Sequence, residues 1–461
     1  MTNPTQTHNP LNRTEGRAAK CTCAVVCFVL AAPGASFARR RHEDPSPAGR
    51  TITRDLSGSV ATRDGLRLRL TTELGNVQIH TQDSNEVDYK VHLETDTSDP
   101  DAQGLLSDFT VSGRAIADGV LLKGYTSNEH CSGRLWITFD VSVPRNFSVE
   151  VSTEGGNIET DDLRGKTTLV TAGGNITTGM LGGPARLETG GGHIRTKDVS
   201  GDLNASTGGG HITTGSIAGN AILRTGGGHI RAGAVSGLAR LETAGGNVSL
   251  EHVGGELVAD TGGGQIEVGE ASGLMRARTG GGGIRVVRVA GPTKLETGAG
   301  SIYLTHVDGA IRASTGAGGI TAWFGPDVKL PGASELQSSE GDIVVYLPKT
   351  FPVTIDARVQ LGDEHRVFVD PAFPLKVSYD EEEGGGRVIR ADGPLNGGGE
   401  TLRLRTVAGN IRLMLSDTSK QIEIYKQQME QLQKQLKLHG RLENPGAPSD
   451  STGHDSDRSP N

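Results

Sequence analysis

Three histidines in identical contexts are the clearest candidates for a chemical role in this sequence. His193, His211 and His229 each follow a run of glycines, in TGGGHIRT, TGGGHITT and TGGGHIRA, and are spaced by eighteen residues. Imidazole nitrogen is a common ligand for zinc and copper. If the eighteen-residue units stack as strands, the three side chains form one outward column with neighbours about 4.8 Å apart. The spacing therefore suggests either a metal site or a ladder of polar side chains beside a tight turn.

The other members of this column favour the ladder. Asn157, Asn175, Asn247 and Gln265 occupy the same place in other units, and amide side chains are not zinc ligands. A polar ladder accounts for the amides and the imidazoles together. We therefore expect no resident metal and no other cofactor, and the three histidines are the residues that would hold a metal if one bound.

The glycine clusters match no nucleotide or calcium motif. A dinucleotide-binding loop needs a third glycine three places after the second, where these units have Arg195, Thr213 and Arg231. The segment 165–167 reads Gly-Lys-Thr, as a phosphate-binding loop ends, but Thr160 occupies the place of its first glycine. Calcium-binding β-repeats need an aspartate after the glycines. That place holds Asn, His, Gln, Ser or Gly here.

Acidic clusters give no convincing catalytic set. The segment Asp363-Glu364-His365 and the acidic run 380–383 are both expected in solvated loops. A glycosidase site would need two convergent carboxylates. In the repeat, Asp260, Arg278 and Glu296 share one outward column, and this alternation of charge stabilises strand register rather than building a site. We therefore predict that the chain is not an enzyme.

The elements that carry these residues repeat with a strict period. A threonine recurs every eighteen residues without a slip, followed after three residues by glycine and after five by an aliphatic residue. The threonines are Thr153, Thr171, Thr189, Thr207, Thr225, Thr243, Thr261, Thr279, Thr297 and Thr315. A period of this kind over ten units indicates stacked supersecondary units rather than a globular domain.

The period contains two short strands and two glycine corners. Apolar and polar residues alternate between the glycines, as in Leu241-Glu242-Thr243, and no helical period is present from 150 to 325. The corner glycines are expected to supply positive φ angles. Two inward positions per unit exchange a large and a small side chain, as in Leu203 with Ala205 and Ala221 with Leu223, which keeps the interior volume level. The pattern predicts an all-β, single-stranded parallel β-solenoid with eighteen-residue coils.

Less regular β-structure is predicted at both ends of the solenoid. Degenerate units begin at Thr72, Ser338 and Thr406. They are expected to form irregular β caps, because open stack ends would otherwise promote aggregation.

The repeat resembles a known family. The phrases VPRNFSVEVSTEGGNIET at 143–160 and LNGGGETLRLRTVAGNIRL at 395–413, together with the TGGG coils, are similar to the exported β-strand-repeat proteins called putative adhesins. The resemblance covers about residues 60–415. It implies a repeat architecture and an exported adhesin-like protein, and it carries over no catalytic residue.

The C-terminal part of the chain has a different pattern from the repeat. Ile422, Tyr425, Met429, Leu432 and Leu436 have the alternating three- and four-residue steps of an amphipathic helix. This short C-terminal α-helix is expected to lie on the end of the solenoid, the alternative being a coiled coil between subunits. The last residues, rich in Ser, Asp and Pro, are expected to be disordered.

The N-terminus predicts export. Arg13, Arg17 and Lys20 precede the apolar run 21–32, and Ser36-Phe37-Ala38 offers a cleavage site before Arg39. The apolar run is too short to span a bilayer, which takes about 20 residues. Cleavage would remove Cys21, Cys23 and Cys27, leave Cys131 alone and exclude an intramolecular disulfide.

The charge of the mature chain argues against one class of partner. Cleavage would leave 43 basic and 53 acidic residues, a net charge near −10. We therefore expect no nucleic-acid partner.

These observations combine into one predicted organisation. The segments are a signal peptide (1–38), an N-terminal β-rich cap (39–150), the regular solenoid (151–325), irregular C-terminal coils (326–415), an amphipathic helix (416–442) and a disordered tail (443–461). We predict a non-enzymatic interaction protein of the periplasm, cell surface or extracellular space, acting through multivalent contacts with a surface ligand such as a glycan or matrix protein. No stable membrane span should remain after cleavage, and the helix offers a route to self-association. The alternatives are a carbohydrate-active β-helix enzyme with its site in the irregular ends, or a periplasmic scaffold or sensor.

Overall fold

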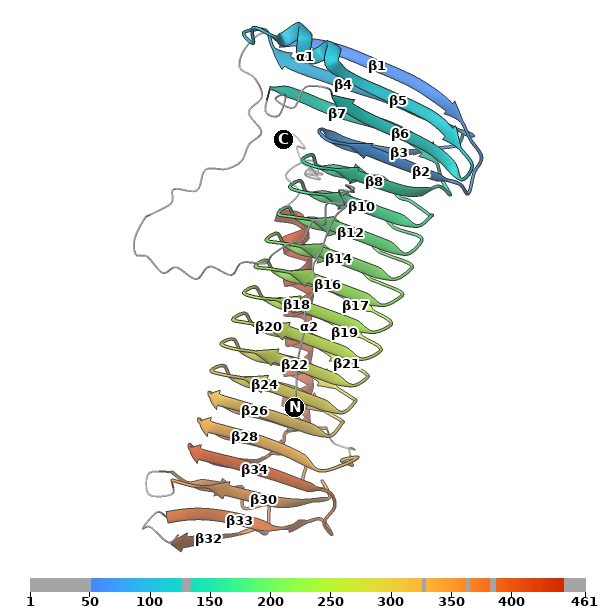
Figure 1. The fold of residues 1–461 in the computed structure, drawn as a ribbon. Helices are drawn as coiled ribbons and strands as arrows, with labels where there is room; N and C mark the ends of the chain where they lie inside the picture. The colour runs from blue at the N-terminus through green and yellow to red at the C-terminus, as the bar shows by residue number, and fades with distance from the viewer. Residues whose placement is uncertain (1–50, 127–133, 326–328, 362–364, 382–386, 443–461) are drawn as a thin grey trace, which may run out of the picture. The chain divides into compact units, whose positions relative to one another are not determined.

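The described part of the chain is all-β, with two long sheets dominated by parallel pairing and two helices (Figure 1). The computed structural model describes residues 51–126, 134–325, 329–361, 365–381 and 387–442. The predicted signal peptide, Cys131, the pair Asp363 and Glu364, and the predicted disordered tail lie outside these residues.

One sheet, here sheet A, takes one strand from each unit. In spatial order its strands are β1 (Thr51–Ala61), β4 (Glu86–Asp96), β7 (Leu135–Pro144), β3 (Asn76–Gln82), β9 (Ile158–Thr160), β11 (Ile176–Thr178), β13 (Ile194–Thr196), β15 (Ile212–Thr214), β17 (Ile230–Val235), β19 (Val248–Val253), β21 (Ile266–Ala271), β23 (Ile284–Val289), β25 (Ile302–Val307), β27 (Ile320–Phe324), β29 (Ile343–Leu347), β35 (Ile411–Leu415) and β31 (Val367–Val369).

The other sheet, here sheet B, takes the second strand of each unit. Its order is β5 (Phe109–Ile116), β6 (Gly119–Thr126), β2 (Arg67–Thr72), β8 (Ser148–Thr153), β10 (Thr167–Thr171), β12 (Ala185–Thr189), β14 (Leu203–Thr207), β16 (Ala221–Thr225), β18 (Ala239–Thr243), β20 (Leu257–Thr261), β22 (Met275–Thr279), β24 (Thr293–Thr297), β26 (Ile311–Ala317), β28 (Ser334–Glu340), β34 (Thr401–Ala408), β30 (Val353–Val359), β33 (Arg387–Leu395) and β32 (Lys376–Glu381).

The register of both sheets follows the sequence period. Within the repeat, each residue lies opposite the residue eighteen positions later, as with Ile194 and Ile212 in sheet A or Thr189 and Thr207 in sheet B. Figure 1 shows the strands of sheet B from β8 to β26 lying side by side in chain order. A residue type that recurs every eighteen positions therefore forms a continuous column across the strands.

The interior is built from such columns. The aliphatic residue five places after each threonine is buried in all ten units, from Ile158 to Ile320. The predicted large and small pairs are buried as well, including Leu203 with Ala205 and Ala221 with Leu223. Fully burying a side chain of this size contributes about 1.5–3 kcal/mol, so the columns are the main source of stability.

A third side of the unit was not predicted from the sequence. Leu163, Leu181, Val199, Ile217 and Val235 are buried and form a row of isolated parallel bridges between neighbouring units. From β17 onward the sheet A strand lengthens from three residues to six and takes in this row. Each unit thus has three inward-facing segments rather than two.

The N-terminal end is closed by antiparallel strands and a short helix. β1 pairs with β4, β4 with β7, and β5 with β6, all antiparallel. Helix α1 (Ala102–Asp108) contacts β1, β4 and β5 and adds Leu105 and Leu106 to the core. This arrangement covers the end of the interior.

The C-terminal end departs from chain order. The strands β34 and β35, from the end of the β region, lie between β28 or β29 on one side and β30 or β31 on the other. The meander of β30, β33 and β32 then finishes sheet B with antiparallel pairs. Part of the acidic run predicted as a loop belongs to this meander, because Asp380 and Glu381 are the last residues of β32, where both are exposed.

The C-terminal helix lies along sheet A and not on the end of the stack as predicted. Helix α2 (Thr418–Leu442) contacts β17, β19, β23 and β25. Leu432 is buried, and Gln433 Nε2 donates to Glu251 Oε1 at 2.9 Å. Below the helix, Thr305 donates to Gln428. No described helix is both long and apolar enough to cross a membrane.

Candidate functional site

The three candidate histidines lie side by side at the corner that precedes the sheet A strands. The ring centroids of His193 and His211 are 4.9 Å apart with an interplanar angle of 17°, and those of His211 and His229 are 4.9 Å apart at 10°. The rings are therefore stacked nearly parallel. Two stacked rings direct their nitrogens in the same direction, whereas two ligands of one metal ion must direct theirs toward a common point.

Each ring already has a hydrogen-bonding role. The backbone N–H of His211 donates to Nδ1 of His193 at 2.9 Å, and that of His229 donates to Nδ1 of His211 at 2.9 Å. An accepting Nδ1 places the proton of the neutral ring on Nε2. A metal at Nε2 would have to displace the ring proton. A metal at Nδ1 would leave a backbone N–H without its acceptor.

The amides in the column make the same bond as the imidazoles. The N–H of Asn175 donates to Asn157 Oδ1 at 2.8 Å, and the N–H of His193 donates to Asn175 Oδ1 at 2.7 Å. Further along, the N–H of Gln265 donates to Asn247 Oδ1 at 3.0 Å. The column is thus a ladder in which each side chain supplies an acceptor to the backbone of the next unit. Across the described part of the chain, no three His, Cys, Asp or Glu residues are arranged to hold a metal.

The repeated threonine has a structural role that the sequence reasoning missed. Thr207 is 6% exposed, and its hydroxyl donates to the carbonyl of Gly192 in the preceding unit at 2.7 Å. The same hydroxyl accepts the N–H of Gly210 in its own unit at 3.1 Å. These two bonds recur from Thr171 to Thr297. Each buried threonine therefore closes its own corner and joins it to the preceding one.

The corner glycines are required for a different reason from the predicted one. None of those from Gly156 to Gly300 has a positive φ angle. A Cβ atom on Gly210 would instead lie 1.9 Å from the carbonyl oxygen of Gly192, whereas one on Gly209 would have no atom within 4 Å. The third residue after each threonine is therefore glycine because consecutive corners approach too closely for any side chain.

The outward charges pair across neighbouring strands, as the sequence indicated. Asp260 and Arg278 are register partners, as are Arg278 and Glu296, and Arg278 Nη2 lies 2.6 Å from Glu296 Oε2. This pairing raises the pKa of Arg278 through the hydrogen bond to Glu296. The neighbouring ion pair Arg224–Glu242, at 2.8 Å, is of the same kind. Such exposed pairs set register and contribute little stability individually.

The remaining candidates from the sequence lie in packing contacts or surface ion pairs. Gly165 packs against the carbonyl of Phe147, Lys166 is exposed and Thr167 is buried, so these residues form no phosphate-binding loop. Asp380 pairs with Arg390 at 3.1 Å across the β32–β33 hairpin. Of the segment 363–365, only His365 is described.

A hollow of about 760 Å³ lies beside the third side of the first units. Its acidic residues are Asp161, Asp162 and Asp198. Asp162 Oδ1 accepts the N–H of Met180 at 2.7 Å, Asp198 Oδ1 accepts the N–H of Ser216 at 2.7 Å, and Asp161 contacts His80 at 3.2 Å. Asp162 and Asp198 thus form the same kind of ladder on a second corner, and Asp161 pairs with a histidine.

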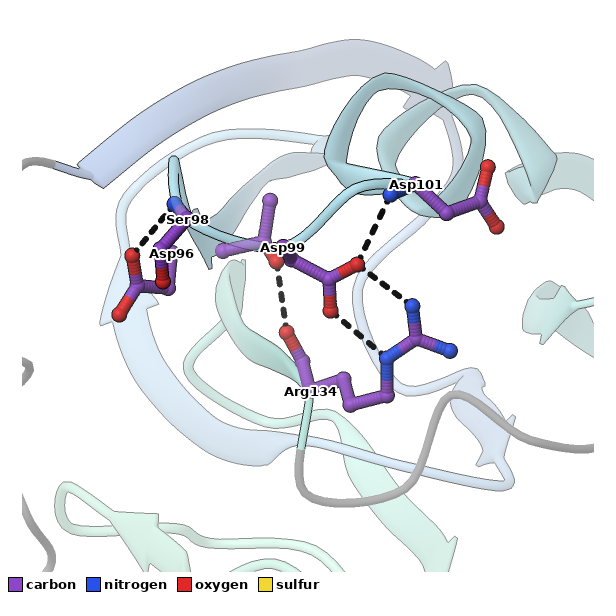
Figure 2. A network of polar contacts seen from close by, with 6 residues as sticks. Asp96, Ser98, Asp99, Asp101 and Arg134 are labelled. Carbon is purple, nitrogen blue, oxygen red and sulfur yellow. Dashed lines mark hydrogen bonds and ion pairs between the residues drawn. The ribbon is translucent and has the colours of Figure 1, made fainter.

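Among the described residues, the carboxyl group with the largest pKa shift lies in the N-terminal end (Figure 2). Asp99 accepts from Arg134, with Nε to Oδ2 at 2.7 Å and Nη2 to Oδ1 at 2.5 Å, and from the N–H of Asp101 at 2.9 Å. The bonds to Arg134, followed by the backbone bond from Asp101, lower the pKa of Asp99 to about 2. The network joins the turn before α1 to the start of β7, where Thr95 also donates to the Arg134 carbonyl at 2.7 Å. Its role is structural.

Replacing Asp99 should lower the thermal stability of the protein by an amount that depends on pH. Because the folded pKa lies below the ordinary value of 3.8, the stabilisation is present above about pH 4 and is lost as the pH falls toward 2. We expect Asp99→Asn to lower the melting temperature by a few degrees at pH 7 and to match the wild type near pH 2. Thermal unfolding followed by circular dichroism at each pH measures this difference.

Asp101→Asn is the matched control, because the Asp101 carboxylate points away from Arg134 (Figure 2). A difference between Asp99→Asn and wild type that stays constant from pH 7 to pH 2 would show that the ionised carboxylate is not the source of the effect.

Comparisons with known proteins find similar solved structures, which include two putative adhesion proteins. No protein-family model matches the sequence, and no curated protein matches it. A putative cell adhesion protein from Clostridium sporogenes is similar at 9% identity and a TM-score of 0.17, over 79% of this chain and 100% of that one. A putative adhesin from Bacteroides fragilis is similar at 14% identity and a TM-score of 0.21, over 65% of this chain and 97% of that one. Likeness at this level assigns no activity.

Proposed function

We propose that this chain is an exported, non-enzymatic β-solenoid that acts as an adhesin-like surface or envelope interaction protein. The observation that carries the proposal is that inward and corner side chains of each unit have a different role from its outward side chains. The buried threonine and the corner side chains bond to the backbone of the neighbouring unit. The outward side chains of the strands are free of this role, and equivalent outward positions recur on each successive strand.

Repeated, equivalent positions favour multivalent binding. A ligand that is itself repetitive, such as a glycan chain or a matrix protein, can contact several units at once, and each further contact forms at high effective concentration. Weak single contacts then add to a stable attachment. The hollow beside the first units supports this reading over catalysis, because its carboxylates Asp161, Asp162 and Asp198 all take part in structural bonds.

The experiment combines localisation with binding. Fractionation of the native cells should place the protein outside the cytoplasm, with Arg39 as its first residue by N-terminal sequencing. The purified protein is then screened against immobilised glycans and matrix proteins at high and low ligand density. We expect apparent affinity on the dense surface to exceed that on the sparse surface by about 10²–10⁴-fold.

Three results would contradict the proposal. Cytoplasmic protein that retains Met1 would exclude export, and equal affinity at the two densities would exclude multivalent contact. Turnover of a glycan in the same screen would instead favour a carbohydrate-active enzyme with its site in the irregular ends.

A further inference from the structure

The outer face of sheet B has a row of cations on three consecutive strands. Arg276 on β22, Lys294 on β24 and Arg312 on β26 are successive register partners. We call these three residues the cation row. All three side chains are exposed, and all three line one surface hollow of about 320 Å³. Register fixes their spacing at the distance between neighbouring strands, about 4.8 Å.

The row has fewer acidic partners than cations. Lys294 Nζ lies 2.6 Å from Glu296 Oε1, but the second oxygen of Glu296 is held by Arg278 at 2.6 Å. Arg276 pairs with Glu256 at 2.9 Å. No acidic side chain in the described part of the chain forms an ion pair with Arg312. Glu335 on β28 is the next register partner of Arg312 and ends the row. The positive charge is therefore confined to β22, β24 and β26, where Arg278 adds a fourth outward cation and Glu296 is the one outward carboxylate.

We propose that the cation row binds a linear anionic polysaccharide that lies across the strands along the stacking direction. The proposal rests on the surface-binding function above and names the ligand class. A polymer with one carboxylate or sulfate on each sugar repeats its charge at a spacing close to that of neighbouring strands. Several anions of one such polymer can then contact Arg276, Lys294 and Arg312 at the same time. An acidic patch on a globular protein has no such repeat.

The neighbouring side chains favour a saccharide over a single-stranded nucleic acid. The outward residues of β22, β24 and β26 beside the row are Arg278, Glu296 and Ser314. Proteins that bind single strands without sequence preference stack the bases on aromatic side chains, and none is present on this part of the face. The carboxylate of Glu296 and the hydroxyl of Ser314 are suited to sugar hydroxyl groups.

The test uses the mature full-length protein and immobilised polygalacturonate, which carries one carboxylate per sugar. The triple variant Arg276→Gln, Lys294→Gln and Arg312→Gln is compared with a control that removes the same charge elsewhere, Lys123→Gln, Lys349→Gln and Lys426→Gln. The control lysines are exposed and lie outside the row. We expect the row variant to bind about ten-fold more weakly than wild type and the control to bind within about two-fold.

Three further measurements define the ligand class. Wild-type binding should weaken steeply as salt rises from about 50 to 300 mM, because exposed charges are screened. Neutral dextran should not bind. Single-stranded poly(dT) should bind more weakly than polygalacturonate, and tighter binding of poly(dT) through the same three residues would overturn the assignment to a saccharide.

Equal losses in the row variant and the control, or no binding of wild type to polygalacturonate, would also overturn the proposal. If wild type nevertheless binds other surfaces in the density screen, the surface-binding function stands and only the row is wrong. If wild type binds none of those surfaces, the proposed function itself fails.

Discussion

Removing residues 207–224 should leave a folded protein, whereas removing only residues 207–215 should give an unfolded or aggregated product. The first deletion joins Ser206 to Thr225 and takes out one whole period, so β14 gains β18 as its new neighbour in sheet B. Leu203 and Ala205 then lie opposite Ala239 and Leu241, which are inward-facing residues already buried in the same columns. Because units contact mainly their neighbours, the loss of stability should be modest.

The shorter deletion should do more damage because it destroys the phase. It removes β15 from sheet A and joins Ser206 directly to Ser216, so β16 can keep its place in sheet B only if sheet A loses a strand. It also removes Gly210 and the corner bonds that Thr207 makes. Backbone groups of β13 and β17 would then be buried without partners, at about 1–3 kcal/mol each.

Both deletion variants are compared with wild type by size-exclusion chromatography and by thermal unfolding followed by circular dichroism. We expect a monodisperse β-rich protein from the eighteen-residue deletion and none from the nine-residue deletion. Equal tolerance of the two deletions would contradict the stacked arrangement.

A single methyl group should distinguish two adjacent glycines of one corner. Gly210→Ala places a Cβ atom 1.9 Å from the Gly192 carbonyl oxygen, the same oxygen that accepts the Thr207 hydroxyl at 2.7 Å. The two corners must move apart, which weakens this bond and the packing around it. We expect destabilisation of about 3 kcal/mol or more.

Gly209→Ala is the matched control, because a Cβ atom at this position meets nothing within 4 Å and the residue has no positive φ angle. Alanine should be neutral there or stabilise by about 0.4–1 kcal/mol, since it restricts the unfolded chain. The repeat itself supports this contrast, because Ala299 and Ala317 occupy the equivalent position in later units. Chemical denaturation of both variants measures the difference, and a larger cost for Gly209→Ala would reverse the assignment of the two positions.

The sequence was sufficient to predict the period and two of the three sides of the unit, but not its third side or the bonds that hold one unit to the next. The eighteen-residue period and the alternation around Ile212 are visible in the chain because burial selects apolar residues at fixed intervals. The recurrence of Thr207 and its counterparts is equally visible. A hydroxyl gives no indication of burial, however, until the carbonyl it bonds to in the preceding unit is placed. For the same reason the invariant glycine suggested a positive φ angle rather than a close approach.

The placement of α2 was beyond sequence reasoning. The spacing of Tyr425, Met429 and Leu432 shows that one face of the helix is apolar, but it does not show which surface receives that face. The receiving surface is an outward column whose members Val287 and Thr305 are 2% and 1% exposed. Gly269 leaves room there for Leu432, whose Cδ2 would lie 3.1 Å from a Cβ at that glycine. Within an eighteen-residue unit these positions look like ordinary solvent-facing residues.

The candidate site was likewise predictable only in part. The outward direction of His193, His211 and His229 could be predicted from their phase, because they precede buried isoleucines by one residue. The bond from each backbone N–H to the Nδ1 atom of the preceding histidine could not be predicted, because it depends on the height of one unit above another. The cation row also depends on pairing between strands, since Arg276, Lys294 and Arg312 are each separated by eighteen residues.

The most direct test of the stacked units is a distance between two spin labels. In a Cys131→Ser background, labels at Gly191→Cys and Gly281→Cys occupy the open corner position five units apart. Their backbones should be about 24 Å apart, and removal of residues 207–224 should shorten this distance by about 4.8 Å. Double electron–electron resonance on the two proteins measures the change. A distance that does not shorten when one whole period is removed would contradict the stack.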